Sequence, residues 1–395
     1  MVLKTGSGAL VPPFLVMDVI AAANAIAASP AASHRRVIRM EVGQPGEGAP
    51  AGVRHAVAAA MATTNPLGYT ESLGRADLRA RIAQHYSEWY GLALPAARIA
   101  VTAGASAGFP LAFLAAFEPG DRIALATPCY PPYLNIMTAL GIQPLLLPAT
   151  AETGFQPTTA MLAALDPPPD GLLIASPANP TGSMLSPDDL AALARYCHAN
   201  GIRLISDEIY HGLTYGKPAV TAAAFSPSAI VINSFSKYFA MTGWRIGWMV
   251  LPEDLIRPVE CLAQNFFICA PHISQIAALA AFDCHAELQS RRAGYASSRA
   301  LLLETLPNAG FPHLSPADGA FYLYADISTT NQNSTDLCRS LLNDHHIAAT
   351  PGYDFDTSRG GNFVRFSYCA AEADIREAVA RLQIRANAPA RSAHD

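Results

Sequence analysis

Short apolar runs alternate with longer helix-like stretches through the middle of the chain. The runs that predict strands cover residues 121–128, 171–177, 203–208, 229–236 and 245–252. Between two of them, SPDDLAALARYCHANG (186–201) predicts a helix, because Ser186 can cap it, Pro187 suits its first position and Gly201 can end it. Strands and helices in alternation predict an α/β fold, with a mostly parallel sheet flanked by helices.

The two ends of the chain carry a different pattern. An Ala-rich stretch predicts a helix within residues 12–36. Toward the C-terminus, helices and short strands are predicted at 291–306, 321–327, 334–346, 363–369 and 372–384. We therefore expect a large domain over residues 45–285 and a smaller α+β domain that is built from residues 1–44 and 286–395.

The composition is that of a folded protein without a basic surface for nucleic acid. The chain has 395 residues, of which 51% are hydrophobic and 14% charged, enough for the cores of two domains. The formal net charge is -5, so no nucleic-acid partner is expected. A phosphate group bound by this protein would be small and held by a few local donors.

The seven cysteines are scattered and include no CxxC pair. They indicate neither a disulfide framework nor a zinc site, so we expect free thiols in a reducing compartment and no metal. At the N-terminus the pair Pro12-Pro13 interrupts the apolar stretch too early for a signal peptide, and no run has the length of a membrane span. These features predict a cytoplasmic protein with no membrane partner.

The first segment with candidate catalytic and ligand-binding residues is SFSKYFAMTGWRIGW (234–248). It follows the apolar run AIVIN. Lys237 therefore lies at the carboxyl end of a predicted strand, where open α/β sheets bind ligands. Ser234, Ser236 and Arg245 could hold a phosphate by charge-assisted hydrogen bonds. The lysine amine could condense with an aldehyde on the same ligand. The alternative is a lysine in a solvated loop.

Asp207 and Tyr210 close another apolar run, in SDEIY (206–210). Their spacing of three would place them on one side of a helical turn. The carboxylate could pair with a protonated ring nitrogen and raise the pKa of that nitrogen, while the tyrosine could donate to a phenolic oxygen. The alternative is an aspartate that only caps a helix.

Two further segments follow predicted strands. In ASPANPTG (175–182), Asn179 is a directional donor and acceptor within a turn of preset geometry. In TAGASAG (102–108), small residues would let the backbone approach a ligand, and the helix that follows would direct free N–H groups at an anion. Ordinary turns are the alternative for both segments.

All four segments share one expected edge, the carboxyl ends of the sheet strands. The order NPTG, SDEIY, then SFSK with TGWRIGW resembles the class I/II aminotransferases among the fold-type I pyridoxal-phosphate enzymes. The resemblance extends from about VGQPG (42–46) to FVRFSYC (363–369). It implies a seven-stranded sheet, pyridoxal 5'-phosphate as cofactor, and a ping-pong transfer of an amino group between an α-amino acid and a 2-oxo acid.

The resemblance also implies how the cofactor is held. Lys237 would carry it as a Schiff base and act in catalysis, Asp207 would pair with its pyridine nitrogen, and Asn179 and Tyr210 would bond its phenolic oxygen. Its phosphate would be bound by Ser234, Ser236, Arg245 and the backbone N–H groups of Ala105 and Ser106.

Further roles follow from the same resemblance. Tyr130, in TPCYPPY, would stack on the cofactor ring, and Tyr69 would reach the phosphate of a neighbouring subunit, so a homodimer with shared active sites is expected. Gly43 and Asn179 would lie beside the substrate, and Arg365 would bind its α-carboxylate. The strand pattern supports this last role, because an arginine between aromatic residues is costly unless it is paired. The alternative is an arginine on an edge strand that faces water.

The sequence leaves two questions open. A carbon–sulfur β-lyase on the same scaffold would need the same cofactor residues, and fold analogy alone favours transfer. The amino donor is also undetermined, because no second cation stands in a motif that would bind a side-chain carboxylate. Arg35, Arg54 and Lys217 are candidates only.

Overall fold

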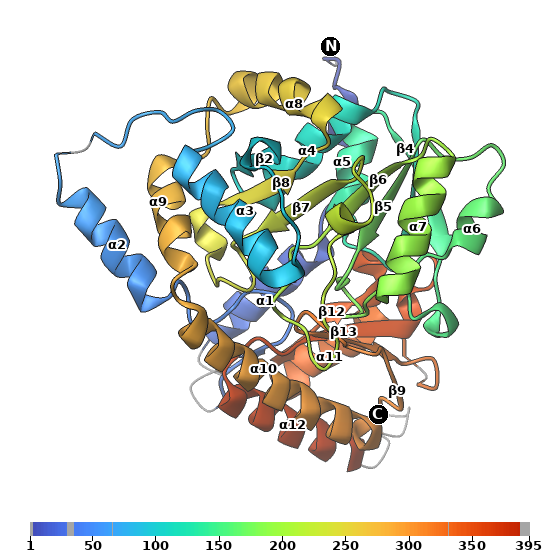
Figure 1. Ribbon diagram of the computed structural model, residues 1–395. Coiled ribbons are helices and arrows are strands. Elements are labelled where there is room, and N and C mark those ends of the chain that lie inside the picture. Colours follow the sequence, from blue (N-terminus) through green and yellow to red (C-terminus); the bar gives the residue numbers. More distant parts are fainter. Residues whose placement is uncertain (1–2, 30–34, 65, 331, 388–395) are drawn as a thin grey trace.

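The structure, a computed structural model, describes residues 3–29, 35–64, 66–330 and 332–387. A seven-stranded sheet in the order β2-β8-β7-β6-β5-β3-β4 forms its centre (Figure 1). Its strands are β2 (Ile99–Thr102), β3 (Arg122–Thr127), β4 (Gln143–Pro148), β5 (Gly171–Ala175), β6 (Arg203–Asp207), β7 (Ile230–Ser234) and β8 (Gly247–Val250). Only β8 runs antiparallel to its neighbours, so the expected α/β fold with a mostly parallel sheet is confirmed.

Helices cover both faces of this sheet, which explains why its inner strands are largely apolar. Leu173 and Ile205 point to one face, and their neighbours Leu172 and Leu204 point to the other. The first face packs against α4 (Ala105–Ala116), α5 (Pro131–Ala139) and α8 (Glu253–Phe266). The second packs against α3 (Ala76–Tyr90), α7 (Pro187–Ala199) and α9 (His272–Ala281). The helices α2 (Ala51–Met61) and α6 (Thr159–Ala163) complete this part of the chain.

Helix α7 begins as its sequence predicts. The Ser186 hydroxyl accepts a hydrogen bond from the backbone N–H of Asp189 at 3.1 Å, and Pro187 occupies the first turn. The chain leaves the helix through Gly201, which has a φ of +69°.

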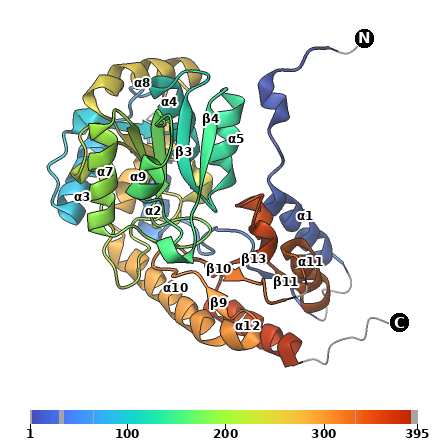
Figure 2. The same ribbon diagram turned by 90° about the vertical axis from the view of Figure 1, so that its right-hand side faces the viewer.

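A second group of elements is built from segments at both ends of the chain. It lies below the large sheet in Figure 2. Its antiparallel sheet has the order β12 (Thr350–Pro351), β13 (Phe363–Ser367), β10 (Tyr322–Asp326) and β9 (His313–Leu314). A parallel pair of β1 (Ile38–Arg39) and β11 (Ile347–Ala348) ties the N-terminal segment to the C-terminal one. The helices of this group are α1 (Leu15–Ala27), α10 (His285–Thr305), α11 (Ser334–His345) and α12 (Glu372–Asn387).

Two elements differ from the sequence-based expectation. The helix expected within 12–36 ends at Ala27, and residues 30–34 lie outside the described part. Arg35 and Arg36, which follow this gap, are not helical, since the chain there leads into β1, where Ile38 pairs with Ile347. The edge strand β4 was not predicted, since its sequence QPLLLP is bounded by prolines and lacks an alternating pattern.

In the described part of the chain, no helix combines the length and the apolar character needed to cross a membrane.

Candidate active site

The carboxyl ends of three neighbouring strands meet at one edge of the large sheet. Asn179 follows β5, Asp207 is the last residue of β6, and Lys237 follows β7. Two adjoining cavities of about 340 Å³ and 160 Å³ open there. Both are lined by Val42, Gly43, Tyr130, Ile209 and Lys237.

Lys237 lies where the two cavities meet. Its ammonium group donates to the backbone carbonyl of Gly43 across 2.7 Å. Burial lowers the pKa of Lys237 to about 8, against the opposing charge of nearby Asp207. The unprotonated, nucleophilic form of this amine is therefore more populated near neutral pH than that of an ordinary lysine.

Gly43 has no room for a side chain. A Cβ atom built there would lie 1.6 Å from the hydroxyl oxygen of Tyr322, a buried residue of β10. The absent side chain lets the backbone of residue 43 line both cavities and accept the hydrogen bond from Lys237.

Asp207 is buried, with 2% of its surface exposed. Its side chain accepts hydrogen bonds from the hydroxyl of Tyr133 and from the backbone N–H of Ile209, the latter at 3.0 Å. Burial raises the pKa of Asp207 to about 6, while these two bonds and the charge of Lys237 act in the opposite direction. The site therefore contains a desolvated carboxyl group that a nearby cation would ionise.

Tyr210 lies in a turn after β6, so the expected helical turn and the helix-capping alternative for Asp207 are both wrong. The turn forms because Asp207 bonds the N–H of Ile209. The hydroxyl of Tyr210 is 2.8 Å from that of Tyr322, and both side chains line the smaller cavity.

Arg365 is buried on β13, an inner strand between β12 and β10, so the alternative of an edge arginine facing water is wrong. Its Nη1 donates to the side-chain oxygen of Asn179 at 2.8 Å. Its Nη2 donates to the hydroxyl of Thr350 at 3.1 Å and to the backbone carbonyl of Glu41. The guanidinium carbon lies 4.4 Å from the ring centre of Tyr322. These contacts fix the plane of the guanidinium, whose Nε has no partner among the described residues.

The larger cavity ends at the start of α4. Ala105 and Ser106 form the first turn of this helix, and Gly104 precedes it with a φ of +78°. A Cβ at Gly104 would lie 2.4 Å from Nη2 of Arg245, which donates to the Ser106 hydroxyl at 3.3 Å. A guanidinium at a helix N-terminus is a favourable environment for a small anion.

Ser234, the last residue of β7, and Ser236, two residues beyond it, line the same cavity. The backbone N–H of Ser236 donates to the hydroxyl of Ser234 at 3.0 Å, so the loop after the strand is held by its own side chain. The structure thus gathers Ala105, Ser106, Ser234, Ser236, Arg245 and Lys237 around one cavity.

The two remaining tyrosines occupy different environments. Tyr130 caps α5 and lines both cavities. Tyr69 is 82% exposed and lines neither cavity of its own chain. It is therefore not brought together with the other candidate residues within one chain.

Several residues of the site were not identified from the sequence. Tyr133 lies one helical turn after Tyr130 in TPCYPPY, a spacing that could have drawn attention to it. Tyr322 precedes Leu323 and Tyr324 in a sequence pattern that is typical of any buried strand. Glu41 is not part of a recognisable motif. Their roles depend on contacts with distant strands, which the local pattern does not encode.

The candidates for a second cation do not line the smaller cavity. Arg35 donates to the backbone carbonyl of Asp344, Arg54 to that of Ala49, and Lys217 pairs with Asp318. Apart from Lys237, Arg365 is the only cationic side chain among the residues that line this cavity in the described part of the chain.

An α/β sheet whose strand ends present a lysine, a carboxyl group and an anion pocket is typical of enzymes that bind a phosphorylated aldehyde. Residues 35–382 match the family of class I and II aminotransferases. The chain belongs to this family, whose members use pyridoxal 5'-phosphate. It is an aminotransferase, an enzyme that moves an amino group between an amino acid and a 2-oxo acid.

Individual relatives agree with this assignment. The chain is 49% identical over 376 residues to a valine–pyruvate aminotransferase of Mycobacterium tuberculosis, covering 94% of this chain and 96% of the relative. An aminotransferase structure from the same organism has a TM-score of 0.94 at 47% identity, covering 97% of this chain and 99% of that one. Aspartate aminotransferase from Thermus thermophilus with maleate has a TM-score of 0.89 at 28% identity, covering 97% and 100%. These relatives favour amino-group transfer over the β-lyase alternative.

Proposed function

We propose that the enzyme binds pyridoxal 5'-phosphate as an imine of Lys237. The amine reaches the cavity that ends at Arg245 and the start of α4, so one ligand could join its aldehyde to the lysine and place its phosphate at the anion pocket. The donors suit a phosphate, because they combine a guanidinium, hydroxyl groups and backbone N–H groups. The phosphate ligands would be Ala105, Ser106, Ser234, Ser236 and Arg245.

The remaining cofactor contacts would come from residues at or after the carboxyl ends of the sheet strands. Asp207 would face the pyridine nitrogen, and its carboxylate would keep a proton on that nitrogen. Tyr210 and Asn179 would donate to the phenolic oxygen, and Tyr130 would stack on the ring. When bound, the cofactor supplies an acceptor for the electron pair of the broken bond.

The side chains would then divide the work of the reaction. Arg365 holds the α-carboxylate of the amino acid with its planar guanidinium, close to Gly43. Once the amino group of the substrate has displaced it, the amine of Lys237 would remove the proton from the α-carbon and return a proton later in the same half-reaction. Because amino acid and oxo acid would use one site in turn, ping-pong kinetics are expected.

We further propose amino acids with uncharged, apolar side chains as donors, and a small oxo acid such as pyruvate as acceptor. The observation that carries this proposal is the lining of the smaller cavity. Phe14, Val16 and Ile209 provide apolar surface, and Arg365 is already assigned to the α-carboxylate. A second carboxylate would be buried there without a cation. The identity to a valine–pyruvate aminotransferase points in the same direction.

A substrate panel tests this specificity. With pyruvate as acceptor, we expect kcat/KM for valine to exceed that for aspartate by about a hundredfold, as for an unpaired buried charge. Phe14→Arg, which adds a cation at the cavity, should shift this ratio toward aspartate. Met17→Arg is the matched control, because Met17 is 57% exposed and does not line the cavity. Equal rates with valine and aspartate in the unaltered enzyme would refute the proposed specificity.

We also propose a homodimer in which Tyr69 completes the phosphate site of the partner. Tyr69 is 82% exposed, and the neighbouring segment presents the exposed apolar residues Phe266, Phe267 and Ile268. The two segments are in contact, because Thr70 donates from its backbone N–H to the sulfur of Cys269. An apolar surface around an exposed tyrosine suits a contact between subunits.

Mixed dimers test the sharing of residues. Lys237→Ala and Tyr69→Ala subunits are each expected to be defective when pure. In a mixed dimer one site would have the Lys237 of one subunit and the Tyr69 of the other, both intact, so activity should reappear on mixing. If mixing restores nothing although mixed dimers form, Tyr69 does not serve the partner's site.

Two broader features remain proposals. The division into residues 45–285 and residues 1–44 with 286–395 is supported by the separate sheets and by the start of α10 at His285. A cytoplasmic location is supported by the cysteines, all seven of which are free thiols.

A further inference from the structure

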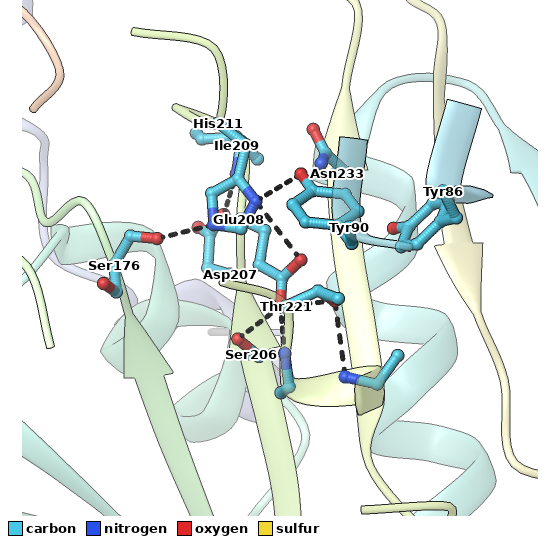
Figure 3. Close-up of polar contacts among 12 residues, drawn as sticks. Tyr86, Tyr90, Ser176, Ser206, Asp207, Glu208, Ile209, His211, Thr221 and Asn233 are labelled. Carbon is cyan, nitrogen blue, oxygen red and sulfur yellow. Dashed lines mark hydrogen bonds and ion pairs between the residues drawn. The ribbon is translucent and has the colours of Figure 1, made fainter. Parts of the chain in front are cut away.

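A cluster of buried and half-buried polar side chains surrounds His211, the residue that follows Tyr210 in the turn after β6. Figure 3 shows His211 at its centre, between Ser176 on one side and Glu208 and Tyr90 on the other. His211 and Glu208 belong to the turn after β6, Ser176 follows β5, and Tyr90 is the last residue of α3. None of these side chains lines either cavity of the site, so the cluster is separate from the groups that would touch a ligand.

The hydrogen bonds of His211 determine which of its ring nitrogens carries the proton. Nε2 lies 3.0 Å from the backbone carbonyl oxygen of Ser176, and a carbonyl can only accept, so Nε2 is the donor. Nδ1 lies 2.7 Å from the hydroxyl of Tyr90. The tyrosine donates to this nitrogen, since burial raises the pKa of Tyr90 well above its ordinary value. His211 is therefore a neutral imidazole that donates in one direction and accepts in the other.

Glu208 lies beside His211 but makes its hydrogen bonds to other residues. One carboxyl oxygen accepts from the hydroxyl of Ser206 at 3.0 Å, the hydroxyl of Thr221 at 3.2 Å and the backbone N–H of Ala222 at 2.8 Å. The other oxygen is 3.5 Å from Nδ1 of His211 and has no hydrogen-bond partner among the described residues. Burial raises the pKa of Glu208 to about 8 and lowers that of His211 to about 4, so both are neutral near pH 7.

The bond from His211 to Ser176 joins the two loops that would hold the phenolic oxygen of the cofactor. His211 is the residue after Tyr210, and Ser176 stands three residues before Asn179. A backbone bond from the Ser176 N–H to the carbonyl of Asp207 at 3.2 Å also joins the two loops, and within its own part of the chain the hydroxyl of Ser176 accepts from the N–H of Leu185 at 3.0 Å. His211 supplies the side-chain contact that fixes the separation of the two loops.

We propose that His211 is a positioning residue for this enzyme: through its Nε2–H bond to Ser176 it holds Tyr210 and Asn179 at the spacing needed to donate to one oxygen atom. This inference rests on the proposed binding of pyridoxal 5'-phosphate. Donors that converge on the phenolic oxygen stabilise its ionised form and lower the pH at which the bound cofactor loses its proton. Loosening the loops should therefore raise that pH.

The test is an absorbance titration of the purified holoenzyme between about pH 5 and 10. His211→Phe and His211→Asn both remove the donor at the Nε2 position. They should move the midpoint upward by on the order of 0.5–1 pH unit, the effect of one weakened neutral hydrogen bond. His211→Gln retains an N–H group at the Nε2 position and should titrate close to the unaltered enzyme.

Tyr90→Phe is the matched control, because it removes a hydroxyl from the same cluster but leaves the bond to Ser176 intact. It should lower the thermal stability of the apoenzyme without moving the midpoint. The proposal is wrong if Asn and Gln at position 211 titrate alike, or if Tyr90→Phe shifts the midpoint as much as His211→Asn. A holoenzyme without a titratable visible or near-ultraviolet band would instead overturn the proposed cofactor site, so the two failures are distinguishable.

Discussion

The guanidinium of Arg365 and the side-chain amide of Asn179 are joined by a hydrogen bond of 2.8 Å, which links a strand of the smaller sheet to a loop of the larger one. The contact orients a guanidinium that also bonds Thr350 and the carbonyl of Glu41. A planar guanidinium that is held in one orientation can bind a carboxylate, and every α-amino acid carries an α-carboxylate.

Arg365→Lys should therefore weaken all amino-acid substrates by a similar factor. Lysine offers one point charge and cannot reproduce two parallel bonds. Losing one charge-assisted bond corresponds to about 1.5–3 kcal/mol, on the order of ten- to a hundredfold in kcat/KM. Amines without a carboxylate serve as the control and should be nearly indifferent. A loss confined to acidic amino acids would mean that Arg365 binds the side chain instead.

Replacement of Asp207 should separate cofactor binding from catalysis. Asp207→Asn keeps an oxygen that can accept from Tyr133 but removes the charge that would face the pyridine nitrogen. We expect bound cofactor and a fall in kcat on the order of a hundredfold or more, with a smaller change in KM. Asp207→Ala, which also removes the acceptor, should be at least as impaired. An Asn variant with near-normal kcat would exclude the proposed role of Asp207.

Glu208→Gln should change how stability depends on pH. Burial raises the pKa of Glu208 from 4.5 to about 8, so between these values the folded protein binds a proton that the unfolded chain does not. Stability from this group is complete below the unfolded pKa and is lost as the pH rises toward 8. The unaltered protein should thus lose stability relative to Glu208→Gln between pH 5.5 and 7.5, by at most about 1.4 kcal/mol per pH unit.

Urea unfolding of the two apoenzymes at several pH values measures this difference. The titratable neighbours of Glu208 are present in both proteins, so their contributions largely cancel; they are Asp207, His211, Tyr86 and Tyr90. A difference in unfolding free energy that is constant over this range would show that Glu208 is ionised in the folded protein.

Much of the site could be predicted because each part follows a strand. Lys237, Asp207 and Asn179 are adjacent in sequence to buried runs, and a parallel sheet brings such positions to one edge. The start of α4 was also predictable from small residues before a helix. These features can be predicted from local sequence patterns and from the rule that a parallel sheet brings the ends of its strands to one edge.

The rest depends on contacts between residues that are far apart in the chain. Tyr322 meets Gly43 and Tyr210 only because β10 and the segment after β1 approach the large sheet. His211 reaches Ser176 across 35 positions through the neighbouring ends of β5 and β6. A histidine after a tyrosine carries no sign of this contact, and QPLLLP carries no sign of an edge strand.

The identity of the lysine that binds the cofactor tests the account most directly. The chain contains only Lys4, Lys217 and Lys237, so borohydride reduction of the holoenzyme followed by peptide mass spectrometry gives an unambiguous answer. We predict loss of the visible or near-ultraviolet band, one reduced pyridoxyl adduct on Lys237, and no adduct and no turnover in Lys237→Ala. An adduct on Lys4 or Lys217 with Lys237 unmodified would contradict the proposed active site.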